Sequence, residues 1–339
     1  MSFLKHLGVG VDLGTSSTLV YVEKKGVVLT EPSVVALERV SGRVLAVGEE
    51  ARRLTGKAGN NALVIRPLRE GVVYDFDATS RMLSYFFRKA VGKQFPKPLA
   101  IVCMPSGVTG AEKHCIAEAA LEAGAGQAYL IEEPVAAAIG AGQDILLEEG
   151  RMVLDIGGGT TDIAVLYGGS VVLSDSVRVA GDACNKAIEL YLARKHGLSV
   201  GESGAEDVKI AYGRAHIEAA QRVVEIRGRS LVTGLPESVP VGTNELVDAL
   251  SEPLALICQC MQNLLARTPL EILEGIRTNG VLMTGGGALL TGLGDYLTDR
   301  LGFPCKAADE PITCVIRGIG VVLDNPAAYN GVIQDYKRV

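Results

Sequence analysis

A pattern that occurs twice in the chain limits the possible folds more than any other feature. Residues 8–22 read GVGVDLGTSSTLVYV, and residues 152–166 read MVLDIGGGTTDIAVL. In each copy an apolar run ends in Asp-x-Gly, small hydroxyl residues follow, and a second apolar run begins, which predicts two strands joined by a tight turn. Asp12 and Asp155 lie 143 positions apart (155 minus 12). Because this spacing is about the length of one domain, we interpret the chain as two related halves.

Both copies continue in the same way. The turns at residues 23–26 and 167–170 each lead into a further apolar run, VVL. Helix-like stretches at 77–91 and 111–123 alternate with the strand-like segment 99–105, which indicates a mixed α/β sheet with helices packed on it. With 339 residues, of which 48% are apolar, the chain can bury two cores.

The two turns share one chemistry. Glycine allows backbone amides to approach an anion closely, and Ser and Thr hydroxyls donate hydrogen bonds to phosphate oxygens. The aspartates would repel phosphate unless a divalent cation lay between them, and Mg²⁺ suits this position because it keeps several waters. One copy alone is better explained as a plain hairpin, since these are ordinary turn residues. Two copies, with a glycine turn at 285–287 after a strand, favour a nucleotide held in a cleft between two lobes.

Other classes of protein are excluded by spacing and charge. The chain has no G-x-x-x-x-G-K-[ST] P-loop, and its glycines at 8–14 lack the dinucleotide spacing and lead into a strand. A net charge of −6 without long basic runs argues against a nucleic-acid partner. The seven scattered cysteines show no zinc spacing and are typical of reduced thiols in a cytosolic protein. The N-terminal residues make a poor secretory signal, and no uncharged stretch is long enough to span a membrane.

Five segments together resemble a known superfamily. VDLGTSSTLVYV, LIEEPVAAAIGAG, VLDIGGGTTDIAVL, AEDVK and MTGGGALLTGL, in this order, are similar to segments of the actin, heat-shock chaperone and sugar kinase superfamily. Within it, the chain resembles the bacterial actin MreB and its close paralogues, from Gly10 to about Asn325. The resemblance implies an α/β, actin-like ATPase fold with two related RNase H-like lobes, four subdomains in all, around a nucleotide cleft.

The resemblance also implies a division of the chain. The first lobe would cover residues 1–145, with a small insertion at about 34–66. The second lobe would cover residues 146–314, with an insertion at about 182–244. The C-terminal segment, 315–339, would return to the first lobe.

ATP and Mg²⁺ are the implied cofactors. Asp12 and Asp155 resemble the pair that holds Mg²⁺ through water. The implied phosphate and adenosine loops comprise Gly14, Thr15, Ser16 and Ser17 in the first hairpin, Gly157, Gly158, Gly159 and Thr160 in the second, and Gly285, Gly286, Gly287 and Ala288 on the adenosine side.

Three residues form the implied catalytic set. Glu133, in Ile-Glu-Glu-Pro, is similar to the family residue that polarises the attacking water, and Thr160 and Asp155 would assist it. From the sequence alone, helix-start chemistry explains an acid just before Pro134 more simply, because such an acid stabilises a helix N-terminus.

Glu206 and Lys209 resemble the pair that contacts ribose and adenine, although Ser203-Gly-Ala-Glu206 also fits a helix capping box. Two departures from the family pattern stand out. Ser16 and Ser17 replace the usual Ala-Asn, and Ser203 with the glycine after it replaces the usual Arg-Thr. Nucleotide affinity or turnover is expected to differ accordingly.

The resemblance implies an ATPase that polymerises into membrane-associated filaments and organises cell-wall synthesis to maintain rod shape. The implied partners are further copies of the chain in paired protofilaments, the inner face of the cytoplasmic membrane, and cell-wall elongation proteins such as MreC, MreD, RodZ and RodA. No nucleic acid is expected. Residues 111–123 resemble the segment that pairs protofilaments, although their pattern is also that of a plain amphipathic helix.

Two segments combine apolar anchors with basic residues, as membrane-contacting segments do. Exposed phenylalanines are also common on ordinary protein surfaces. The anchors are Phe3, Leu4 and Leu7 beside Lys5, and Phe95 in the loop at 92–97.

Two rival classes remain open. A small-molecule kinase of the same superfamily would need an acceptor pocket and an aspartate base, for which Asp75 or Asp77 are candidates, although residues 72–77 do not resemble a sugar-binding loop. A chaperone ATPase would need a further substrate-binding region, which we do not expect after the last nucleotide motif.

Overall fold

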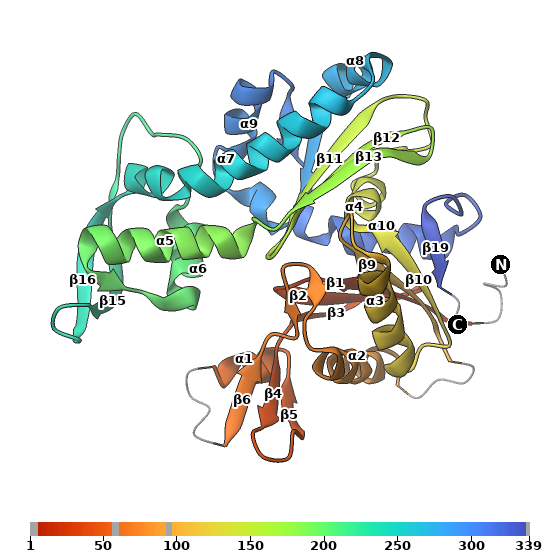
Figure 1. Cartoon of the computed structure of the whole chain (residues 1–339), viewed down its shortest axis with the longest axis horizontal. Coiled ribbons are helices and arrows are strands. Elements are labelled where there is room, and N and C mark those ends of the chain that lie inside the picture. Colours follow the sequence, from red (N-terminus) through yellow and green to blue (C-terminus); the bar gives the residue numbers. More distant parts are fainter. Residues whose placement is uncertain (1–5, 56–60, 93–96, 337–339) are drawn as a thin grey trace.

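The computed structural model describes residues 6–55, 61–92 and 97–336. Two large sheets form the centres of two lobes (Figure 1). The strands of the first sheet are β1 Gly8–Leu13, β2 Ser17–Val22, β3 Gly26–Pro32, β9 Leu99–Met104, β10 Gln127–Glu132 and β19 Ile333–Tyr336. Those of the second are β11 Arg151–Ile156, β12 Thr161–Tyr167, β13 Ser170–Val177, β17 Val281–Thr284 and β18 Cys305–Ala307.

The two sheets share one topology, which confirms the predicted repeat. The first has the order β19-β10-β9-β1-β2-β3, and the second, β18-β17-β11-β12-β13. In each, an antiparallel meander (β1–β3 or β11–β13) continues into two parallel strands on the side of its first strand. The first sheet has one more strand, because β19 pairs antiparallel with β10.

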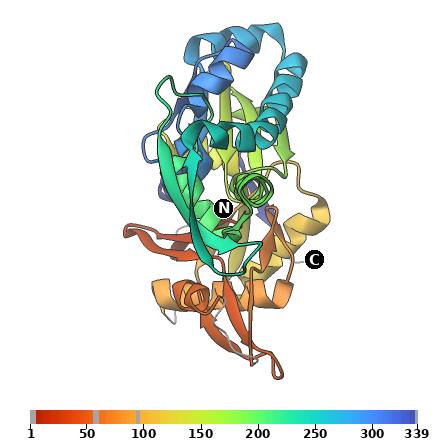
Figure 2. The ribbon, with the colours of Figure 1, turned by 90° about the vertical axis from the view of Figure 1, so that its left-hand side faces the viewer.

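Smaller sheets project from each lobe. In the first lobe they contain β4 Val35–Glu38, β5 Val44–Val47 and β6 Ala62–Ile65, beside α1 Glu49–Arg53, and the pair β7 Leu68–Arg69 and β8 Val72–Val73. In the second they contain β14 Leu198–Ser199, β15 Val223–Ser230 and β16 Pro236–Gly242, beside α5 Gly181–His196 and α6 Gly201–Tyr212. Figure 2 views the molecule from this side, with the β14–β16 sheet in front and the β4–β6 sheet below it. The predicted lobe boundaries at 145 and 314 stay a prediction.

The remaining helices cover the large sheets. They are α2 Phe76–Val91, α3 Gly110–Glu122, α4 Glu133–Gly140, α7 Thr243–Arg267, α8 Leu270–Asn279, α9 Leu293–Leu301 and α10 Cys314–Asp324, with 3-10 turns η2 Gly286–Leu289 and η3 Pro311–Thr313. The helices predicted at 77–91 and 111–123 are therefore present as α2 and α3.

The capping box predicted at Ser203–Glu206 is wrong. Helix α6 already begins at Gly201, and its N-cap residue, Val200, makes no side-chain capping bond. Gly201 has a φ of +68°, a conformation that glycine adopts without strain, so the chain enters the helix soon after β14. Glu206 consequently lies in the second turn of the helix.

Helices α4 and α10 lie between the two lobes (Figure 1). They approach each other closely, because a Cβ on Gly140 would collide with the carbonyl oxygen of Cys314, and one on Gly318 with that of Ala136. The apolar cluster around them contains Ile101 from the first sheet and Val153 from the second, both buried. The lobes are therefore joined by one continuous core beneath the cleft.

Candidate functional site

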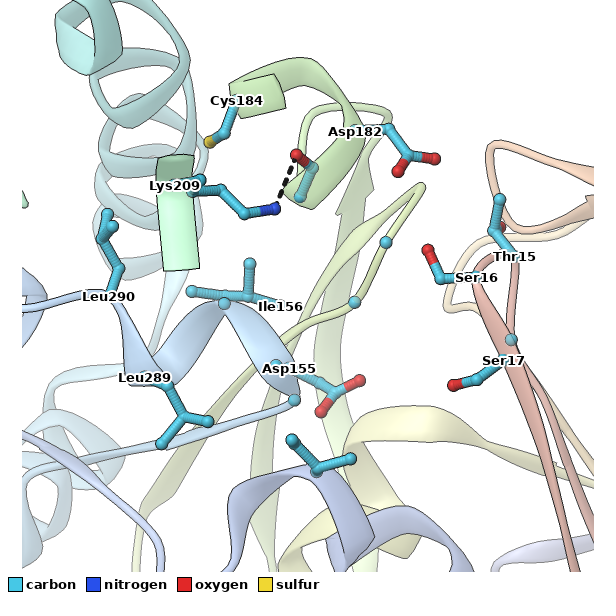
Figure 3. Close-up of a pocket in the computed structure, with 18 of the residues that line it drawn as sticks. Thr15, Ser16, Ser17, Asp155, Ile156, Asp182, Cys184, Lys209, Leu289 and Leu290 are labelled. Carbon is cyan, nitrogen blue, oxygen red and sulfur yellow. Dashed lines mark hydrogen bonds between the residues drawn. The ribbon is translucent and has the colours of Figure 1, made fainter. Parts of the chain in front are cut away.

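A cavity of about 420 Å³ lies between the lobes and is lined by both repeated hairpins. In Figure 3, residues 15–17 lie on one side of it and Asp155 and Lys209 on the other. The predicted site residues that line this cavity are Asp12, Gly14, Thr15, Ser16, Ser17, Glu133, Asp155, Gly157, Gly158, Glu206, Lys209, Gly285, Gly286 and Gly287.

The two hairpins form the same turn. The backbone N–H of Gly14 donates to the carbonyl of Ser17 at 3.1 Å, and that of Gly157 donates to the carbonyl of Thr160 at 2.9 Å. In both copies the donor glycine follows its aspartate by two residues. The sequence repeat is thus a repeat of backbone hydrogen bonding.

The hairpins also face each other closely across the cavity. A Cβ on Gly158 would collide with the Ser16 hydroxyl, and one on Gly159 would lie 2.6 Å from the Thr15 Oγ1. Glycine is therefore required at these two positions because the other hairpin occupies the space of a side chain.

Asp12 and Asp155 both line the cavity, Asp155 buried and Asp12 half-buried. Burial raises the pKa of Asp12 to about 7, a hydrogen bond from the Cys103 thiol at 3.2 Å opposes this change, and the charge of Asp155 adds to it. Burial raises the pKa of Asp155 to about 6, against a 2.6 Å hydrogen bond from the Thr284 hydroxyl. A bound cation would stabilise the ionised form of both carboxylates here.

These residues fit a hydrated magnesium ion. In the described part of the chain, no group of three or more His, Cys, Asp or Glu side chains is arranged to hold a metal ion. Two carboxylates with neighbouring hydroxyls suit Mg²⁺, which takes one or two protein carboxylates and completes its shell with water and phosphate oxygens.

Glu133 is the first residue of α4, and only 9% of it is exposed. Burial raises its pKa well above the usual range, and the charges of Asp162, Asp155 and Asp12 raise it further. The Cys103 thiol lies 3.6 Å from its Oε1. The helix-start explanation and the predicted role beside the reacting water are compatible, because the same residue begins α4 and lines the cavity.

The wall formed by the second lobe is more apolar. Lys209 donates a hydrogen bond to the Gly181 carbonyl at 3.1 Å, which is the dashed line in Figure 3. Ile210 is 75% exposed and Leu289 58%, although both line the cavity. Exposed apolar side chains at a cavity mouth suit the flat face of a nucleobase.

Three predicted residues do not line this cavity. Thr160 lines a second cavity of about 170 Å³, bounded by both lobes. Gly159 contacts the turn between β7 and β8, since its Cβ would lie 2.9 Å from the Cα of Glu70. Ala288 is buried in η2. The predicted role of Thr160 beside the reacting water stays a prediction.

Several other predicted features can be placed. Asp75, a candidate base of the kinase alternative, caps α2 by accepting from the Ala78 backbone N–H at 2.9 Å. The predicted membrane anchors Phe3, Leu4 and Phe95 lie outside the described residues, so the structure leaves this prediction untested. In the described ranges no helix has the length and apolar character to cross a membrane.

Two lobes of one topology, with a cavity between their paired acidic hairpins, define an actin-like fold. Comparison with known proteins narrows this class. A family model described as "MreB/Mbl protein" matches residues 6–331. The chain is 47% identical over 318 residues to the cell shape-determining protein Mbl of Bacillus subtilis (strain 168), covering 94% of this chain and 96% of Mbl. The chain belongs to the MreB/Mbl family.

Two further matches agree with this assignment. The cell shape-determining protein MreB of Escherichia coli (strain K12) is 42% identical over 322 residues, covering 93% of each chain. Crystallised MreB5 of Spiroplasma citri bound to ADP superposes with a TM-score of 0.90 at 32% identity, covering 97% of this chain and 98% of MreB5. The same protein bound to AMPPNP gives a TM-score of 0.89, covering 96% and 99%.

Proposed function

We propose that the chain binds ATP with Mg²⁺ in the inter-lobe cavity, hydrolyses it, and assembles into cytoskeletal filaments at the membrane. The observation that supports this most is the placement of Asp12 and Asp155, one from each lobe, in one cavity where each bears a raised pKa. Bound Mg²⁺ would offset phosphate charge there. ADP and AMPPNP in the MreB5 structures support a nucleotide as the ligand.

The residues around the phosphates and the metal have defined tasks in this proposal. Asp12 and Asp155 hold the metal through water, and the backbone amides and hydroxyls of residues 14–17 and 157–158 bind phosphate oxygens. Glu133 accepts a hydrogen bond from the attacking water and orients it, which suits phosphoryl transfer because that reaction depends mainly on positioning and charge stabilisation. A phosphate that touches both hairpins draws the lobes together, and its loss loosens them.

The hydrolysis proposal is tested with Glu133→Ala. We expect phosphate release to fall about a hundredfold because water is no longer oriented, whereas AMPPNP affinity stays close to that of the wild type. Glu50→Ala, an exposed acid on α1, is the matched control. Unchanged phosphate release from the Glu133 variant would remove this residue from the chemistry.

Self-assembly is supported by the turn between β15 and β16, which projects from the second lobe. Val232 is 90% exposed, Leu235 64% and Leu231 58%. Contact between such a tip and a different surface of a second copy is heterologous, and it extends into a filament where successive copies do not close into a ring. With ATP and Mg²⁺, light scattering should show a concentration threshold, and Val232→Glu should raise it. Thr233→Ser, in the same turn, is the control.

Membrane contact is supported by the residues that border the two candidate anchor segments. His6 and Lys97 border them, and the His6 Nδ1 lies 2.8 Å from the Lys97 carbonyl oxygen. Two weak anchors on one molecule bind a membrane better than either alone. Phe95→Glu should reduce co-sedimentation with anionic vesicles, whereas Phe303→Glu, in the second lobe, should not.

The names of the relatives support a role in cell shape. We propose that filaments of this chain organise cell-wall synthesis together with elongation proteins of the MreC, MreD, RodZ and RodA type. Loss of rod shape on depletion, restored by the wild type and not by Glu133→Ala, would support the link between hydrolysis and shape. Normal shape after depletion would contradict it.

A further inference from the structure

A buried hydrogen bond joins the two lobes next to Glu133. Asp162, on β12, is fully buried, and its Oδ1 accepts a hydrogen bond from the backbone N–H of Ser106 at 2.7 Å. Ser106 lies in the segment between β9 and α3 of the first lobe. A bond from a backbone amide to a carboxylate in such a buried place is among the stronger hydrogen bonds in proteins.

The same serine is bonded to the start of α4. Its hydroxyl donates to the Glu132 Oε2 at 2.8 Å, and Glu132 is the N-cap residue of that helix. Glu133 follows as the first helical residue. Asp162, Ser106 and Glu132 thus form a chain of contacts from the second lobe to the residue that precedes the candidate water-orienting acid.

The contacts that link Asp162, Ser106 and Glu132 lie outside the nucleotide cavity. Neither Ser106 nor Asp162 lines that cavity, whereas Ser106, with Thr160 and Ser176, lines the smaller second cavity. Burial raises the pKa of Asp162 to about 7. The hydrogen bond from the Ser106 N–H and the hydroxyl groups of Ser176 and Thr160 oppose that rise. Residues of both lobes surround this position, so a change in lobe closure bears on the Ser106–Asp162 bond.

We propose that Ser106 and Asp162 are positioning residues for the proposed hydrolysis. They fix the N-terminus of α4, and with it the carboxylate of Glu133, and they make that placement depend on lobe closure. The inference rests on the proposed function, since it assigns the placement of an acid that must orient water. Support of this kind behind a reacting group typically changes rate more than ground-state binding.

The test compares turnover with nucleotide affinity. Ser106→Ala should lower kcat about tenfold or more, the scale seen when supporting hydrogen bonds are removed, with AMPPNP affinity within about twofold of the wild type. Ser106→Thr, which keeps the hydroxyl, should recover most of kcat. Asp162→Asn keeps an acceptor for the Ser106 N–H and should lose less than Asp162→Ala. Asp175→Asn, on neighbouring β13, is the matched control and should leave kcat unchanged.

Hydrogen exchange supplies a readout that does not require turnover. The Ser106 amide should be protected in the wild type and more so with AMPPNP and Mg²⁺, and Asp162→Ala should lose this protection while β11 stays protected. Unchanged kcat in folded Ser106→Ala, an equal loss of kcat and affinity, or an Asp162→Asn as impaired as Asp162→Ala would each overturn the proposal. If the wild type hydrolyses no ATP, the proposed function fails instead, and exchange still reports on the bond.

Discussion

The two repeated hairpins have the same backbone but different side chains. The first presents hydroxyls, from Thr15, Ser16 and Ser17, whereas the second presents three consecutive glycines. Where the hairpins meet, a Cβ on Gly158 would occupy the position of the Ser16 hydroxyl. If both hairpins carried the hydroxyl-bearing sequence, their side chains would clash where they meet. If both carried the glycine sequence, a gap would remain there. The repeat therefore preserves acid and turn, while the side chains of the two copies have become complementary.

The aspartates of the two hairpins differ in their hydrogen-bond donors and in their pKa values. Asp12 is bonded to Cys103, a weak donor, and Asp155 to Thr284, a stronger one. The pKa of Asp12 is raised to about 7 and that of Asp155 only to about 6, with burial as the main cause for both. In the absence of ligand, the two carboxylates of the predicted metal site therefore differ in how readily they ionise.

The largest expected effect is on stability as a function of pH. The folded-state pKa values of Asp12 and Asp155 lie above their ordinary value of 3.8. Stability from these groups is therefore fully present below pH 4 and is lost as pH rises through about 6 to 7. One pKa unit corresponds to about 1.4 kcal/mol, so the loss amounts to a few kcal/mol.

Thermal unfolding of nucleotide-free protein between pH 4 and 8, with and without Mg²⁺–AMPPNP, measures this effect. Groups elsewhere also titrate, so Asp12→Asn serves as the reference. We expect the variant to be less sensitive to pH than the wild type in the absence of ligand. Equal pH profiles for the two proteins would contradict the electrostatic difference between the hairpins.

The next effect separates ligand binding from stability. Asp12→Asn and Asp155→Asn should each weaken Mg²⁺-dependent AMPPNP binding by about 10- to 100-fold. Without ligand, both should be more stable than the wild type at pH 8, because a neutral amide avoids the burial of charge. The gain should be larger for Asp12, whose pKa is raised more. Calorimetric titration and thermal unfolding measure both, with exposed Asp144→Asn as the control.

A third effect tests whether the hairpins fit each other. Gly158→Ala should destabilise the ligand-bound protein because the added methyl group collides with the Ser16 hydroxyl. Ser16→Gly in the same chain should relieve the collision, with a coupling energy of about 1 kcal/mol. Strictly additive variants, measured by unfolding with bound AMPPNP, would show that the hairpins do not constrain each other.

Local sequence allowed the hairpins, their acids and the repeated β-meander to be predicted, because turn residues and apolar periodicity are properties of neighbouring residues. It gave no sign of Cys103 or Thr284, which reach the two aspartates from parallel strands far along the chain. The role of Asp162 was missed for the same reason, although it stands in the quoted motif. Its partner, Ser106, is contributed by the other lobe.

The smallest effect concerns the departure of the first hairpin from the family pattern. Ser17 offers one hydroxyl donor where an asparagine amide would offer two N–H groups. Ser17→Asn should therefore tighten AMPPNP binding, and a net hydrogen bond of about 1 kcal/mol corresponds to roughly fivefold. The same residue placed in the second hairpin, Gly158→Asn, adds bulk where even a Cβ would collide with the Ser16 hydroxyl, so it should weaken binding. If both variants shifted affinity in the same direction, the division into a hydroxyl-bearing hairpin and a space-giving hairpin would be wrong.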